Sequence, residues 1–247
     1  MRVLTFSSRN TKEIMRDPLS LFFGIGFPLV LLVLLSLINR SIPKGQGPDL
    51  FEIEKLAPGI AVFGLSFLAL FSSMLIAKDR TSSFVLRLFT SPLKPVDFIL
   101  GYTLPMLPMA IAQSVVCFAF SLLFGLELSA NLLLAVVVNI PIAVVFIALG
   151  LLFGTVLNEK AVGGVCGALL TNLSAWFSNI WFDTSLVGGV FSTIANILPF
   201  SHAVNAARAA VAGDYAAIMP ELLWVIAYAA VLTAAAVAVF AAKLKKN

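Results

Sequence analysis

Residues 131–157 read NLLLAVVVNIPIAVVFIALGLLFGTVL and contain no charged side chain. A helix that crosses the hydrocarbon core of a bilayer needs about 20 such residues, so this run is long enough to span a membrane. Further uncharged runs of adequate length lie on both sides of it, at 19–38, 56–77, 98–124, 161–182 and 222–242. The sequence therefore predicts an all-α integral membrane protein with six transmembrane helices.

The composition supports this class. Of the 247 residues, 60% are hydrophobic and only 11% are charged, whereas a soluble domain has roughly 25% charged residues. So few charges cannot cover the apolar side chains of a water-soluble protein of this size. We expect one transmembrane domain over 1–247, with membrane lipid as the solvent for much of its surface.

The basic residues predict the orientation. With six spans, the N-terminus, 78–97, 158–160 and the C-terminus share one side, and the other side holds only Arg40, Lys44, Lys55 and Arg208. The first side carries Arg2, Arg9, Lys12, Arg16, Lys78, Arg80, Arg87, Lys94, Lys160, Lys243, Lys245 and Lys246. Because Lys and Arg concentrate in cytoplasmic loops, we expect a multi-pass protein of the cell membrane with both termini in the cytoplasm.

Residues 184–207 form another uncharged run, but only Asp183 separates them from the span at 161–182. The run also contains glycine, proline, asparagine and histidine, which lipid penalises unless protein or water covers the backbone. We therefore predict an extracellular re-entrant or interfacial region over 183–215.

Residues 2–16 (RVLTFSSRNTKEIMR) mix apolar and cationic side chains, as in a helix that lies in the headgroup layer. Asp17-Pro18 ends it, because proline disfavours helix at the residue before it. The sequence thus predicts an N-terminal interfacial amphipathic helix over 1–17.

The loop at 78–97 reads KDRTSSFVLRLFTSPLKPVD. Its apolar side chains Phe84, Val85, Leu88 and Phe89 recur at helical spacing and form a stripe. A short amphipathic helix must bury such a stripe against the inner leaflet or against a protein partner, and the spacing does not distinguish the two.

Motifs for chemistry on this chain are missing from the sequence. No stretch matches G-x-x-x-x-G-K-[ST], so the chain has no phosphate-binding loop and is not expected to hydrolyse ATP by itself. No carboxylate lies in the middle of a predicted span, which disfavours an ion-coupled carrier. His202, Cys117 and Cys166 have no metal-ligand spacing. We expect no cofactor, no metal and no nucleic-acid partner.

Uncharged polar residues gather in the span at 161–182, where Asn172 and Asn179 accompany Trp176. Gln113 and Asn139 could belong to the same polar surface. These side chains either form hydrogen bonds between helices or line a translocation path.

Three stretches resemble the ABC-2 type transporter permeases. Residues 78–102 (KDRTSSFVLRLFTSPLKPVDFILGY) are similar to the loop between their second and third spans, 16–28 to the entry into their first span, and 198–214 (LPFSHAVNAARAAVAGD) to the segment before their last span. The matching residues in the first stretch are Asp79, Arg80, Arg87, Thr90, Ser91, Pro92, Leu93, Lys94, Pro95, Asp97 and Gly101.

The resemblance implies a permease subunit of an ATP-driven exporter, which pairs with a second copy or a paralogue. Separate cytoplasmic ATPases would bind ATP and Mg, so the chain itself is no enzyme. It also implies that the loop helix docks on the ATPase rather than on lipid. The implied contact residues are Asp79, Arg80, Phe84, Val85, Arg87, Leu88, Phe89, Thr90 and Pro92.

Substrates of this family include drugs, lipids, peptides and glycans, so the resemblance implies export of an amphipathic or lipid-like compound. The alternative is a membrane anchor or assembly component of a maturation or resistance complex, which transports nothing itself.

Overall fold

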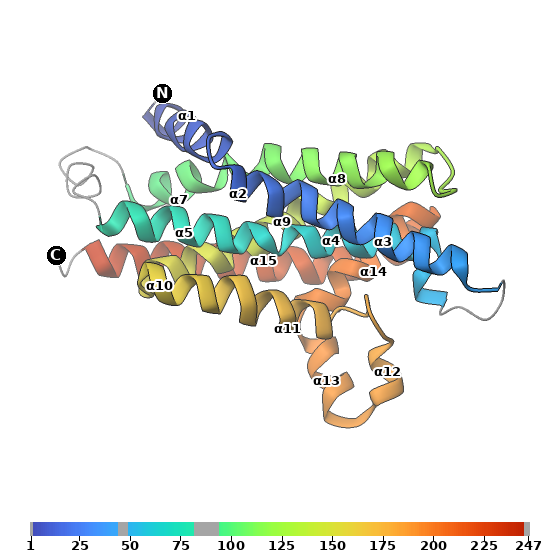
Figure 1. The fold of residues 1–247 in the computed structure, drawn as a ribbon. Coiled ribbons are helices and arrows are strands. Elements are labelled where there is room, and N and C mark those ends of the chain that lie inside the picture. The colour runs from blue at the N-terminus through green and yellow to red at the C-terminus, as the bar shows by residue number, and fades with distance from the viewer. Residues whose placement is uncertain (1, 44–48, 82–93, 245–247) are drawn as a thin grey trace.

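The computed structural model describes residues 2–43, 49–81 and 94–244, and these residues form helices and connecting turns without a strand. Five helical segments are long and apolar enough to cross a membrane, and they run alongside one another (Figure 1). Their bounds are Pro18–Ser41, Ile53–Thr81, Pro95–Leu122, Ala130–Val156 and Tyr215–Lys243. Five of the six predicted spans are thus confirmed as candidate membrane helices.

Several of these segments consist of more than one helix. The first contains α2 (Pro18–Leu21), η1 (Phe22–Gly26) and α3 (Phe27–Ser41). The second contains α4 (Ile53–Leu65) and α5 (Phe67–Thr81), and the third contains α7 (Pro95–Thr103) and α8 (Met106–Leu122). The last two are the continuous helices α9 (Ala130–Val156) and α15 (Tyr215–Leu244).

The predicted span at 161–182 differs from the other five. The chain is helical there through α10 (Glu159–Val162), η3 (Gly163–Leu170) and α11 (Thr171–Trp176), and the helix ends well before residue 182. Glu159, Lys160 and Asn172 lower the hydropathy of this stretch, so it is not among the five apolar helices.

The predicted re-entrant region forms three helices. α12 (Thr184–Val187) and α13 (Gly189–Ile197) project from the side of the bundle, whereas α14 (Pro199–Ala212) returns to pack on α15, α9 and α4 (Figure 1). Gly188, between α12 and α13, has φ +67°, a left-handed conformation that favours glycine. The backbone therefore reverses direction there at little cost.

The predicted N-terminal helix is present as α1 (Arg2–Met15), and Ile14 and Phe6 are among its buried residues. It lies at the same end of the bundle as the last turns of α15 (Figure 1). The end of α5 and the start of α7 lie there too. We call this end the N/C end.

The core is built around α9, whose sequence contains Gly150 and Gly154 four residues apart. A Cβ atom on Gly150 would lie 2.8 Å from Cα of Ala69, and one on Gly154 would lie 2.7 Å from Cα of Ser73. Hence α5 and α9 approach so closely that their backbones leave no room for a side chain. Small residues at this spacing allow such contacts between membrane helices.

Replacing Gly154 by alanine is therefore expected to destabilise the fold by about 1–3 kcal/mol, the usual cost of overpacking. A lower melting temperature of the purified protein in detergent would show it. Gly163→Ala is the matched control, since nothing lies within 4 Å of its added Cβ, and alanine favours helix over glycine. An equal loss in both variants would contradict the close α5–α9 contact.

Candidate functional site

A buried carboxylate links three elements at the N/C end. Asp79, near the end of α5, is only 2% exposed. Arg9 of α1 donates from both terminal nitrogens to its carboxylate, at 2.6 and 2.9 Å, and the hydroxyl of Tyr102 on α7 donates to the same carboxylate at 2.9 Å. One side chain thus joins α1, α5 and α7.

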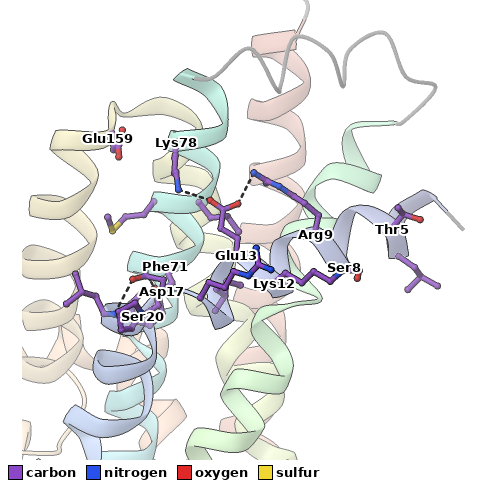
Figure 2. Close-up of a pocket in the computed structure, with 17 residues that line it drawn as sticks. Thr5, Ser8, Arg9, Lys12, Glu13, Asp17, Ser20, Phe71, Lys78 and Glu159 are labelled. Atoms are coloured by element: carbon purple, nitrogen blue, oxygen red, sulfur yellow. Dashed lines mark hydrogen bonds and ion pairs between the residues drawn. The ribbon is translucent and has the colours of Figure 1, made fainter.

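The ion pairs continue from Arg9 to the surface. Glu13, one helical turn further along α1, lies 2.8 Å from Arg9 and accepts a hydrogen bond of 2.8 Å from Lys78 (Figure 2). Burial alone would lower the pKa of Arg9, but the hydrogen bond that Arg9 donates to Asp79 and the charges of Asp79 and Glu13 outweigh it, so the pKa is raised. Arg9 therefore stays charged. We call Arg9, Glu13, Lys78, Asp79 and Tyr102 the charged junction.

Apolar and amide contacts hold α1 on α7 beside the charged junction. The ring of Phe6 packs edge-on against Tyr102 and Phe98, with centroids 4.9 and 5.9 Å apart. Asn10, which is fully buried, donates to the carbonyl of Gly101 at 3.0 Å. Since α5 precedes residues 82–93 and α7 follows them, both ends of the predicted coupling loop are attached to α1.

Arg80 ties the end of α5 to α9. Its guanidinium donates to the carbonyls of Gly154 at 2.7 Å and Leu157 at 3.2 Å. Carbonyls in the last turn of a helix lack partners within the helix, so a cation there satisfies them. This contact connects the loop to the central helix of the bundle.

Asp79 and Arg80 were both predicted to contact an ATPase. In the structure they form hydrogen bonds with other residues of the same chain. The other residues predicted to make that contact lie outside the described residues: Phe84, Val85, Arg87, Leu88, Phe89, Thr90 and Pro92.

The polar residues predicted to line a path fall into separate groups. Asn172 and Trp176 are exposed and lie one turn apart on α11, where the Asn172 amide donates to the carbonyl of Ala168 at 2.8 Å. Asn179 has φ +61°, and its side-chain oxygen accepts from the backbone and the hydroxyl of Thr184 at 2.9 and 2.7 Å. Asn179 thus stabilises the turn into α12.

Gln113 and Asn139 are 2% and 1% exposed, inside the chain. Gln113 donates to the carbonyl of Ala61 at 3.2 Å, and Asn139 donates to the hydroxyl of Ser114 at 3.0 Å. The structure therefore does not bring these two side chains to the surface that Asn172 exposes, and they connect α8 to α4 and α9.

A polar contact that was not predicted from the sequence lies at the end of the bundle away from α1. His202 of α14 pairs through Nδ1 with Glu221 of α15, and its Nε2 lies 2.8 Å from the carbonyl of Asn196. A carbonyl only accepts, so Nε2 carries a proton. This contact joins the end of α13 to the last span.

Two aromatic residues of α15 complete this attachment. Trp224 Nε1 and the hydroxyl of Tyr228 both donate to the carbonyl of Ile197, at 3.1 and 2.9 Å. Glu221, Trp224 and Tyr228 recur at helical spacing, and this periodicity was the available sequence signal. Without the fold, however, it does not reveal which segment they bind.

Within the described parts of the chain, no group of three or more His, Cys, Asp or Glu side chains could hold a metal ion. The charged junction joins α1, α5 and α7 through ion pairs and hydrogen bonds.

Comparison with known families agrees with this arrangement of apolar helices. Residues 1–211 match the family model described as ABC-2 type transporter. No individual curated protein matches the chain. Because the match covers most of the 247 residues, the chain, a multi-pass membrane protein, belongs to the ABC-2 type transporter family.

Proposed function

We propose that this chain is the permease subunit of an ABC exporter and that it moves an amphipathic or lipid-like substrate, drug, peptide or glycan. Two copies, or one copy and a paralogue, form the path, and separate cytoplasmic ATPases supply the energy from ATP and Mg. The observation that carries the proposal is the charged junction, which attaches to α1 the two helices that flank residues 82–93 of the predicted loop at 78–97, in a member of this transporter family.

The junction suggests how movement would spread. An ATPase that binds the loop would push on the ends of α5 and α7 together, since Arg9, Asp79 and Tyr102 connect both to α1. Arg80 would pass the same movement to α9 through its two carbonyl contacts. The helices would thus move as a unit rather than bend separately.

The proposed layout has six spans, with α10, η3 and α11 as the fifth and both termini in the cytoplasm. In it, α1 lies at the interface, and 183–215 dips into the outer leaflet. The position of α1, the end of α5, the start of α7 and the last turns of α15 at one end of the bundle supports it. We place the path at the exposed face of Asn172 and Trp176. Gln113 and Asn139 would reach it only after the helices around them move.

Reconstitution tests this proposal. The full chain would be coexpressed with each ABC ATPase of the same genome in turn, and complexes would be placed in proteoliposomes with labelled phospholipids, dyes and glycolipids. We expect a complex with two permease copies and two ATPases that moves at least one probe only when ATP is hydrolysed. The control is an ATPase variant that binds but does not hydrolyse ATP. A complex that hydrolyses ATP and moves no probe would instead favour the anchor function.

A further inference from the structure

An open cavity of about 1310 Å³ lies between α1, the start of α2 and α5 (Figure 2). Pockets for drug-sized ligands measure roughly 300–1,000 Å³ and enclose most of the ligand. A cavity that is larger and open on one side fits part of a long molecule better than the whole of a small one.

Its wall on the membrane helices is apolar. Phe71, Met74 and Leu75 of α5 line it, together with Leu19 from the first turn of α2. Leu19 is 66% exposed and Met74 is 42% exposed. Leu19 belongs to the first membrane span, and Phe71, Met74 and Leu75 belong to the second. The apolar wall therefore extends toward the hydrocarbon core.

Its rim on α1 is cationic. Lys12 and Arg16 lie at i and i+4, which places them on one face of the chain at the end of α1. Among the described residues, neither side chain has an ion-pair or hydrogen-bond partner, whereas Arg9 and Lys78 are engaged with Asp79 and Glu13. The cations that remain for a ligand are thus Lys12 and Arg16.

Four cationic side chains and three carboxylates line the cavity, so the lining keeps a net positive charge. Glu13 already binds two cations, and the carboxylate of Asp17 accepts from the backbone of Leu19 at 3.1 Å and from the hydroxyl of Ser20. Glu159 lies across the cavity from Lys12 (Figure 2). The rim therefore favours an anion.

We infer that this cavity binds one anionic phospholipid from the leaflet that contains α1. Its phosphate lies between Lys12 and Arg16, where a guanidinium can hold two phosphate oxygens, and an acyl chain covers Met74 and Leu19. A soluble anion would leave the apolar wall exposed, and a zwitterionic lipid would bring its own headgroup cation close to Lys12 and Arg16, which repel it. The site needs only the permease in a membrane, so it does not depend on transport.

Native mass spectrometry of the full chain, released from mild detergent with defined lipids, tests this site. We expect one phosphatidylglycerol to be retained per permease copy, no comparable retention of phosphatidylcholine, and no displacement by inorganic phosphate. Removing one basic residue near an anionic membrane surface should weaken binding on the order of fivefold. The double variant Lys12→Gln, Arg16→Gln should therefore bind roughly 25-fold more weakly.

Two further variants distinguish a specific lipid site in the cavity from non-specific attraction between anionic lipid and basic residues. Lys243→Gln removes an exposed cation of α15 that does not line the cavity, and it should retain the lipid fully. Met74→Trp fills the apolar wall but keeps both cations, and it should lose the lipid. Equal retention of both lipids, or full retention by the double variant or by Met74→Trp, would overturn the inference. So would rapid disulfide formation between two copies of Met74→Cys in lipid, because a second permease copy would then occupy the cavity.

Discussion

Replacing Phe84 and Leu88 together by alanine is expected to abolish binding of the ATPase. Burying one such side chain contributes roughly 1.5–3 kcal/mol, so the double truncation removes up to about 6 kcal/mol. At about 1.4 kcal/mol per tenfold, binding weakens by several powers of ten. Both residues lie outside the described parts of the chain, and the expectation rests on their helical spacing and on the proposed docking of the loop.

Copurification of the ATPase with the permease in detergent at moderate salt measures this loss, with coupled ATP hydrolysis as the second readout. Arg87→Ala is the control in the same loop, because a charge at the rim of a protein contact contributes about 0–1 kcal/mol, so this variant should keep most of the binding. The double variant should still insert and form dimers. If it retained its ATPase at wild-type levels, the stripe would belong to the lipid surface instead.

Replacing Asp79 by alanine is expected to release α1 from the bundle. The Asp79 side chain is 3% exposed and that of Arg9 is 36% exposed, so their pairing lies between an exposed pair at about 1 kcal/mol and a buried pair at about 3–5 kcal/mol. The hydroxyl of Tyr102 also loses its acceptor, which costs about 1–3 kcal/mol for a buried group. Together these terms predict a loss of roughly 3 kcal/mol in the free energy of unfolding.

The expected signs are a lower melting temperature and faster proteolysis within α1. Asp79→Asn separates the two contributions, because an amide can still accept from Tyr102 but no longer pairs with the charge of Arg9. A double-mutant cycle of Asp79→Ala with Arg9→Ala should be non-additive, since the two groups contact each other. Glu159→Ala removes an exposed carboxylate without a described partner and should change little. Additive effects at residues 9 and 79 would show that the ion pair does not hold α1.

Most of the membrane helices could be predicted from the sequence because bilayer thickness sets their length. A segment in lipid must satisfy its own backbone groups, so a long uncharged run such as 131–157 becomes a helix whatever surrounds it. The helix break at Asp17-Pro18 could also be predicted, because proline disfavours helix at the residue before it. The prediction of a membrane span was least accurate at 161–182, where glycines and asparagine interrupt the apolar run and the helix ends at Trp176.

The burial of individual polar residues could not be predicted in this way. Lipid tails are as apolar as leucine. The side of a membrane helix that faces lipid and the side that faces protein therefore differ little in hydropathy. Gln113, Asn139 and Asn172 all sit in apolar runs, yet packing buries the first two and exposes the third. Their sequence neighbours carry no signal of this difference.

By itself, the sequence determined that this chain is helical and lies in a membrane, that charged residues cluster at the span ends, and that its motifs resemble one transporter family. Those properties follow from local hydropathy and short-range patterns. Only the tertiary structure decided that Asp79 binds Arg9, 70 residues away, that α5 and α9 meet at Gly150 and Gly154, and that His202 pairs with Glu221. Such pairings depend on which helices become neighbours, and helix adjacency arises from packing over the whole chain rather than from the residues on either side of a charge.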